Sequence, residues 1–183
     1  MHNRRSLLAS LLAMGGVGLL VKSRASRAAP AVPGKVTIVM FTDAGMNQGP
    51  MLVDKVVKTE AEWRALLPPQ SFEVTRHADT ERPFSGALNS EHNHGLFRCI
   101  CCATALYSSD TKFDSGTGWP SFYQPIAKQN VVEKTDTSFG TVRTEILCTR
   151  CDAHLGHVFD DGPRPTGLRY CMNSVALKFV KHA

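Results

Sequence analysis

Hydrophobic and polar positions divide this chain of 183 residues into three stretches. The first is a charge-free apolar run from Leu7 to Val21, which follows Arg4 and Arg5. The second, up to about residue 95, carries a few helical signals between polar loops. The third consists of short β-prone segments separated by Gly, Pro and Asp, a pattern that favours antiparallel sheets over alternating strands and helices. We therefore expect a mainly β domain behind an N-terminal leader.

Residues 1–28 have the composition of an export signal, with small residues before a predicted cleavage site after Ala28. The apolar run of 15 residues is shorter than the ~20 that a membrane-spanning helix needs, which disfavours the alternative of a permanent anchor. The sequence Arg4-Arg5-Ser6-Leu7-Leu8 indicates a twin-arginine signal, with a general secretory leader as its competitor. We expect export to a bacterial periplasm and no stable membrane association after cleavage.

Residues 29–57 form a predicted linker and N-terminal arm, and residues 58–183 form the predicted main domain. Within the arm, residues 36–41 suit either a strand or an ordered segment that lies on the domain. Thr59 and Glu62 make a capping box, which predicts a helix that starts there. Its predicted buried stripe is Trp63, Leu66 and Leu67, and a second short helix is expected from Pro69.

The net charge of the chain is +5, which taken alone suggests an anionic partner such as nucleic acid. All of this excess lies in the leader, because residues 1–28 contain five Lys or Arg residues and no Asp or Glu. The exported part is electrically balanced. This balance disfavours nucleic acid as a partner.

Two Cys-x-x-Cys pairs predict a metal site. Cys99 with Cys102 and Cys148 with Cys151 would each aim two sulfurs at one point, and together they would bind one zinc ion tetrahedrally. Disulfide bonds are the alternative, because the exported compartment oxidises thiols. A thioredoxin-like redox motif is disfavoured because the surrounding strand–helix–strand pattern is missing.

Cys171 remains outside this predicted metal site. A strand through it would project Arg169, Cys171 and Asn173 from one face, and a neighbouring cation favours the reactive thiolate. His154 and His157 lie upstream and suit acid–base chemistry near Cys171, although metal binding or a plain core role stays open. Trp119, in a Gly-rich loop, suits a pocket wall or the core equally well.

From about Lys58 to Phe179 the chain resembles the zinc-containing methionine-R-sulfoxide reductases of the B class. The resemblance rests on ordered motifs, which are residues 80–84, the two cysteine pairs, residues 112–122, His154 to Phe159, residues 161–163 and residues 167–174. It implies two antiparallel sheets in a small barrel-like or tent-like core with a few short N-terminal helices. It also implies one structural zinc, bound by four cysteines.

For function, the resemblance implies reduction of the R epimer of methionine sulfoxide in oxidised proteins. Cys171 would attack the sulfoxide sulfur and become a sulfenic acid, with His157, His154 and Asn173 assisting. Trp119, Phe159 and Arg169 would bind the substrate or polarise the thiol. We expect a monomer that a thioredoxin-like protein regenerates.

The chain departs from many relatives of this family at Thr117, which occupies the place of a resolving cysteine. Either Cys101 resolves the sulfenic acid, or an external thiol protein reduces it directly. A different class of function also stays open, in which a zinc-bound sheet binds a partner and Cys171 is merely buried.

Overall fold

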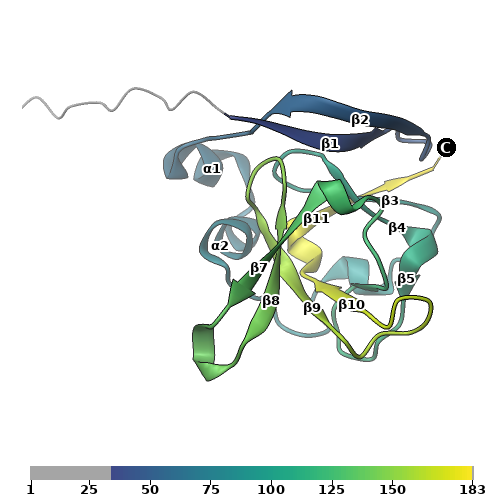
Figure 1. The fold of residues 1–183 in the computed structure, drawn as a ribbon. Helices are drawn as coiled ribbons and strands as arrows, with labels where there is room; N and C mark the ends of the chain where they lie inside the picture. Colours follow the sequence, from purple (N-terminus) through teal and green to yellow (C-terminus); the bar gives the residue numbers. More distant parts are fainter. Residues whose placement is uncertain (1–33, 183) are drawn as a thin grey trace, which may run out of the picture. The chain divides into compact units, whose positions relative to one another are not determined.

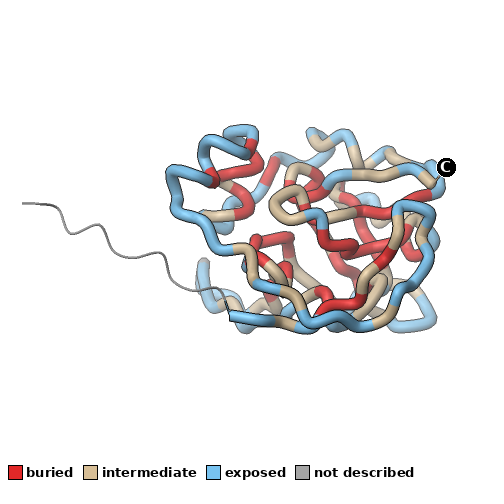
Figure 2. Tube along the Cα trace, turned by 90° about the horizontal axis from the view of Figure 1, so that it is seen from above, coloured by how far each residue is buried: buried red, intermediate tan, exposed pale blue. Residues whose placement is uncertain are grey.

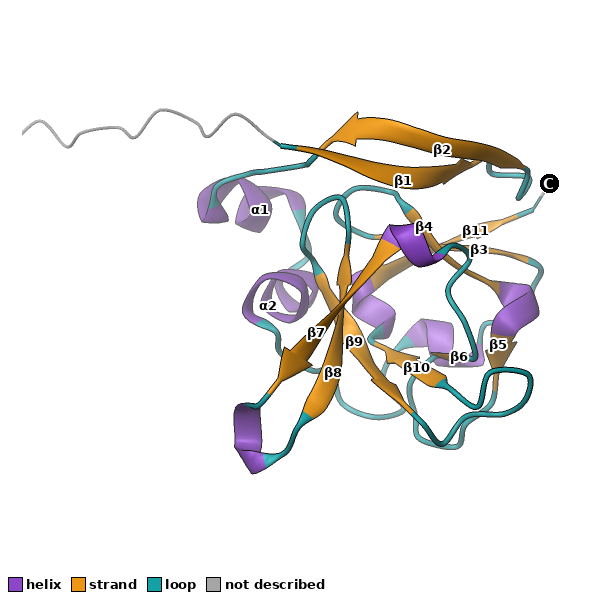
Figure 3. Ribbon diagram, in the orientation of Figure 1, coloured by secondary structure: helices purple, strands orange, loops and turns teal. Residues whose placement is uncertain are grey.

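Residues 34–182 are described in this computed structural model. The predicted leader of residues 1–28 and its cleavage site lie outside the described residues. In the described part, no helix is long and apolar enough to cross a bilayer. Strands dominate, with two short α-helices and several single-turn 3-10 helices between them (Figure 3).

The two helices follow the predicted local signals. Helix α1 (Glu60–Leu66) begins at Thr59, where both hydrogen bonds of the capping box form, and α2 (Pro69–His77) begins with proline in its first turn. Trp63 and Leu67 are buried as predicted, but Leu66 is 61% exposed, so the predicted stripe was wrong at this position. The helix ends at Leu66, and only the i, i+4 pair faces the core.

Eleven strands of the described chain form three antiparallel sheets. A two-stranded sheet pairs β1 with β2, a three-stranded sheet has the order β11-β3-β4, and a six-stranded sheet has the order β5-β6-β10-β9-β8-β7 (Figure 1). The bounds are β1 (Lys35–Phe41), β2 (Asn47–Asp54), β3 (Gly95–Cys99), β4 (Ala105–Ser108), β5 (Lys112–Phe113), β6 (Ser121–Phe122), β7 (Val131–Asp136), β8 (Arg143–Cys148), β9 (His154–Phe159), β10 (Arg169–Met172) and β11 (Leu177–Lys181). The predicted mainly β, antiparallel fold is confirmed.

The segment at residues 36–41 is a strand, and β1 and β2 form a hairpin. Val39 and Phe41 are buried against Leu96 and Ala105. The buried Asn130 side chain fastens this hairpin, since it accepts from the Val39 amide at 2.7 Å and donates to the Val39 carbonyl at 2.9 Å. The hairpin is therefore tied to the main sheets by a satisfied buried polar group.

The main core lies between the large sheet, the three-stranded sheet and the helices, where the buried segments concentrate (Figure 2). Tyr107 and Phe122 stack there with ring centroids 4.4 Å apart, and Phe97 meets Phe122 edge to face. Helix α2 packs against β9 and against the 3-10 turn at residues 174–176. This packing fixes β9 and the segment after β10, which carry the residues described next.

Candidate active site and metal centre

Four cysteine sulfurs meet at the ends of β3 and β8. All four atoms lie within 4.8 Å of one another, with Cys99 to Cys151 at 3.6 Å and Cys102 to Cys148 at 3.5 Å. A tetrahedron with Zn–S bonds of ~2.3 Å has sulfur–sulfur edges of roughly 3.8 Å, so the cluster has the size of a four-thiolate zinc site. A disulfide needs sulfurs about 2.05 Å apart, and the six described cysteines are all free.

The two cysteine turns have the same backbone geometry. In each, the residue after the second cysteine donates its amide to the carbonyl of the first, from Ala103 to Cys99 and from Asp152 to Cys148, both at 2.9 Å. Ala103 and Asp152 both adopt positive φ, at 59° and 56°. Two matching turns that present soft thiolates in this way form a zinc-binding site, as the spacing of the pairs predicted.

Cys101 lies inside the first turn but belongs to neither the predicted ligand set nor the pocket of Cys171. It is not one of the four cysteines whose sulfurs lie within 4.8 Å of one another. It does not line the cavity at Cys171.

Cys171 lies on β10 between β6 and β9, opposite Ser121 on one side and His157 on the other. It lines a cavity of about 140 Å³ together with four other residues predicted or suspected from the sequence, namely His157, Phe159, Trp119 and Asn173. Thr80, Arg143, Gly156 and Met172 complete the wall. Gly156 on β9 pairs with Met172 on β10, and a Cβ at Gly156 would collide with the Cys171 carbonyl oxygen. The closeness of β9 and β10 at this point therefore requires glycine.

Burial raises the pKa of the Cys171 thiol, and the Arg169 charge opposes that rise. The Arg169 charge acts to lower the pKa of Cys171, but the desolvation of the thiol has the larger effect and raises it. Two hydrogen bonds of 2.8 Å to Asp161 hold the guanidinium, which also lies 4.4 Å from the centre of the Phe159 ring. Arg169 therefore does not line the cavity itself. It packs on Phe159 and favours the thiolate form of Cys171. The half-buried Thr117 hydroxyl lies 3.9 Å from the Cys171 sulfur.

A β-bulge places both histidines on one face of β9. Residues three apart in a regular strand point to opposite faces. Opposite β8, however, Ile146 pairs with Gly156 and Leu147 with His154, so Leu155 is an extra residue in β9. The rings of His154 and His157 therefore lie side by side, with centroids 5.4 Å apart.

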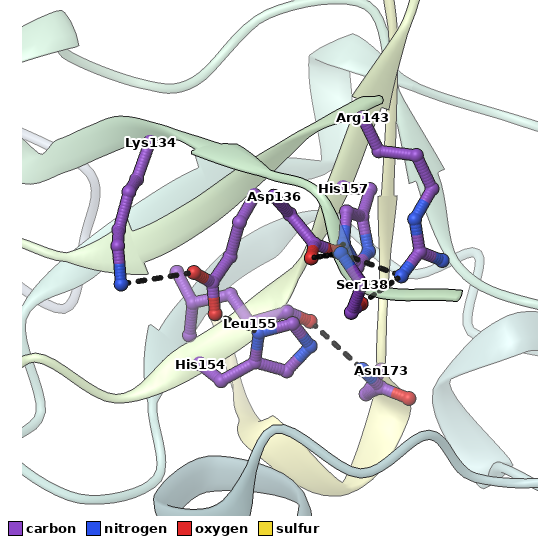
Figure 4. A network of polar contacts seen from close by, with 9 residues as sticks. Lys134, Asp136, Ser138, Arg143, His154, Leu155, His157 and Asn173 are labelled. Atoms are coloured by element: carbon purple, nitrogen blue, oxygen red, sulfur yellow. Dashed lines mark hydrogen bonds and ion pairs between the residues drawn. The ribbon is translucent and has the colours of Figure 1, made fainter. Parts of the chain in front are cut away.

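Each histidine has its own carboxylate. His157 Nε2 lies 2.8 Å from Asp136 (Figure 4). His154 Nδ1 lies 2.7 Å from Glu145. His154 is buried, does not line the cavity, and its Nε2 is buried without a partner. Burial lowers the pKa of His154, while Glu145 opposes that change. Of the two histidines, His157 is the one that faces the cavity.

Asn173 is buried at the cavity wall and fixed at both ends of its amide. Its Nδ2 donates to the Leu155 carbonyl at 3.2 Å, and its Oδ1 accepts from the Glu81 amide at 3.0 Å. Trp119 Nε1 donates to the Glu81 carbonyl at 3.1 Å. The Glu81 carboxylate accepts from the amides of Ser174 and Val175, and burial raises its pKa. Glu81 therefore connects the loop that carries Trp119 to the strand that carries Cys171.

Sequence reasoning did not identify Glu81, Asp136, Arg143 or Glu145 as site residues. Glu81 lies inside the motif at residues 80–84, so this motif was the available signal. Asp136 and Arg143 come from the end of the β7–β8 hairpin, where nothing local distinguishes them from ordinary surface charges. Only the pairing of the strands brings them to His157.

The fold and the two sites define a zinc-binding, mainly β protein with one cysteine in a histidine-lined cavity. Residues 67–181 match the model of the SelR domain family, and the chain belongs to this family. It is 57% identical over 128 residues to a peptide methionine sulfoxide reductase MsrB of Herminiimonas arsenicoxydans, covering 70% of this chain and 93% of that protein. It is 58% identical over 127 residues to the MsrB protein of Pseudomonas putida strain W619, covering 69% and 96%.

Proposed function

We propose that this protein reduces the R epimer of methionine sulfoxide in oxidised proteins to methionine. The observation that carries the proposal is the position of Cys171, which lines a small cavity opposite His157 and shares it with Trp119 and Phe159. A thiol, a proton-transfer group and apolar walls are what a sulfoxide with a methyl group needs. The relatives named above bear the name of this activity.

In the first step, the Cys171 thiolate attacks the sulfoxide sulfur. The sulfoxide oxygen takes up one proton and ends on Cys171, which becomes a sulfenic acid, while methionine leaves. Cys171 is oxidised by two electrons and the substrate sulfur is reduced by two. The oxygen needs that proton to leave the substrate, and His157 is the titratable ring that lines the cavity.

The remaining residues orient the substrate and the catalytic groups. Trp119 and Phe159 pack on the methyl group and the side chain of the substrate. Asn173, held at both ends, presents a fixed amide at the cavity wall. His154 packs against His157 from the buried side and keeps its ring in place. Bound zinc would hold the β3 and β8 turns together, away from the reacting sulfur.

We propose that an external thiol protein of the thioredoxin type regenerates Cys171. Thr117, rather than a cysteine, faces the Cys171 sulfur, and Cys101 lies at the zinc site. Two thiols of the reductant would convert the sulfenic acid back to a thiol, with release of water and formation of a disulfide in the reductant. The leader sequence supports periplasmic export as the setting for this reaction.

Turnover of the two separated sulfoxide epimers with dithiothreitol tests the proposed function. We expect methionine from the R epimer and none above background from the S epimer. The competing function, a zinc-bound module with an inert Cys171, predicts no turnover of either epimer and no alkylation of Cys171 in the native protein. Equal turnover of both epimers would contradict the stereochemical assignment.

A further inference from the structure

A carboxylate outside the cavity wall makes the only hydrogen bond that a described residue makes to the His157 ring. Asp136 ends β7, which is separated from β9 by β8, and its Oδ2 lies 2.8 Å from His157 Nε2 (Figure 4). The contact crosses over β8 at the end of the β7–β8 hairpin. We propose that Asp136 is a positioning residue, which holds the neutral His157 ring with its proton on Nε2 and its Nδ1 turned to the substrate. This proposal rests on the proposed function.

Asp136 is held on three sides. The amide of Ser138 donates to its Oδ1 at 2.8 Å, and Arg143 donates to Oδ2 at 2.7 Å, the oxygen that also meets His157. Hydrogen bonds from Ser138, followed by those from His157 and Arg143, lower the pKa of the Asp136 carboxyl group. An ionised carboxylate only accepts hydrogen bonds, so the proton between the two groups lies on His157 Nε2.

This assignment decides which ring nitrogen takes part in proton transfer. No described residue hydrogen-bonds to Nδ1 of His157, and the residue lines the cavity beside Cys171. With Nε2 committed to Asp136, Nδ1 is the atom that takes up the proton released when the Cys171 thiol ionises, and it passes this proton to the sulfoxide oxygen. A carboxylate on one ring nitrogen fixes the tautomer and the orientation of the other in this way.

The second carboxylate–histidine pair makes a useful contrast. Glu145 holds His154 at a similar distance, 2.7 Å, but His154 is buried away from the cavity. The pair of Asp136 and His157, in contrast, is connected to the cavity through Arg143, which binds Asp136 and lines the cavity. The hairpin end thus connects the orientation of His157 to the cavity itself.

The test compares Asp136→Asn and Asp136→Glu with the wild type, using a peptide that contains the R-sulfoxide and dithiothreitol as reductant. A misplaced proton donor costs on the order of 10- to 100-fold. We therefore expect Asp136→Asn to lower kcat by about that factor, with KM changed less than about threefold. Asp136→Glu should recover part of kcat, because it restores a carboxylate. Glu133→Gln is the matched control, since Glu133 lies on the same strand and its carboxylate meets Tyr170 instead, at 3.3 Å.

Nitrogen-15 resonances of the His157 ring provide a readout that a merely structural role would not move. We expect the neutral wild-type ring to carry its proton on Nε2, and Asp136→Asn to give a mixture of tautomers. The proposal is overturned if wild-type His157 carries the proton on Nδ1, which can be measured even if the variants do not fold. It is also overturned if folded, zinc-loaded Asp136→Asn keeps kcat within twofold of the wild type. Absence of turnover by the wild type would instead count against the proposed function.

Discussion

The cysteines of this molecule lie in two regions that differ in what surrounds the sulfur atoms. At the ends of β3 and β8, four sulfurs converge within 4.8 Å and form a metal site. On β10, Cys171 lies in a cavity without another cysteine on its wall. The first arrangement commits every thiolate to a metal and leaves no reactive sulfur. The second keeps one sulfur uncommitted, buried enough to raise its pKa and open enough to meet a substrate.

The surroundings of a cysteine, and not its thiol, therefore determine its role in this molecule. Convergent turns with matching hydrogen bonds define the metal site, and their role is structural. Around Cys171 the neighbours are a cation, a hydroxyl and a histidine, which act on charge and on protons. Substitutions at the two sites can separate the structural role of the four converging cysteines from the reactive role of Cys171.

Loss of a metal ligand should have the largest effect. Structural zinc contributes on the order of 10–16 kcal/mol in small peptides, which is comparable to the total stability of a domain, about 5–15 kcal/mol. We expect Cys148→Ser to lose zinc and to unfold, as measured by metal content and circular dichroism. Cys101→Ser is the matched control and should keep both zinc and turnover. A folded and active Cys148→Ser protein without metal would contradict the structural role of the site.

Loss of the proposed nucleophile should remove activity and leave the fold intact. A serine hydroxyl is a far weaker nucleophile than a thiolate, so we expect Cys171→Ser to reduce turnover of the R-sulfoxide by about 10⁴-fold or more. Zinc content and the thermal midpoint should stay close to those of the wild type. Turnover within tenfold of the wild type would remove Cys171 from its role.

Replacement of Arg169 should shift the pH dependence rather than abolish turnover. The thiolate is the reacting form, and the pKa of Cys171 is raised, so the rate should increase as pH rises through that pKa. Arg169 opposes the rise in this pKa, and Arg169→Leu should therefore move the ascending limb to higher pH. Below the pKa the thiolate fraction changes about tenfold per pH unit. An unchanged profile of kcat/KM against pH would show that Arg169 does not act on the thiol.

Restoring a cysteine at the loop position should change only how the enzyme is regenerated. The Thr117 hydroxyl lies 3.9 Å from the Cys171 sulfur, close enough that a small movement would join two sulfurs there. After one equivalent of R-sulfoxide without reductant, Thr117→Cys should contain a disulfide between the introduced cysteine and Cys171, detected by peptide mapping. The wild type should keep its sulfenic acid, and a Cys101–Cys171 disulfide in the wild type would mean that Cys101 resolves it.

Local signals in the sequence predicted local structure well. The capping box at Thr59 started α1, and the two cysteine pairs formed the metal site, because each depends on residues a few positions apart. Leu66 shows the limit of a periodic pattern, since it lies in the last turn of the helix and stays exposed while Trp63 and Leu67 face the core.

The surroundings of the histidines could not be predicted in the same way. The bulge at Leu155 is visible only in the pairing of β8 with β9, and without it His154 and His157 would point to opposite faces. Asp136 contacts His157 because the β7–β8 hairpin pairs with β9 through β8. Glu81 contacts residues 173–175, which lie more than 90 positions away in the sequence. Such contacts depend on tertiary structure, which short motifs do not encode.

The most direct measurement is a single turnover without reductant, followed by mass spectrometry. The purified protein is mixed with one equivalent of a peptide that contains methionine R-sulfoxide, trapped with a sulfenic acid reagent and digested. If Cys171 takes the oxygen, the peptide that contains Cys171 will carry the reagent, and one equivalent of reduced peptide will appear. Reduced peptide with an unmodified Cys171, or with the modification on a cysteine of the metal site, would contradict the assignment of chemistry to Cys171.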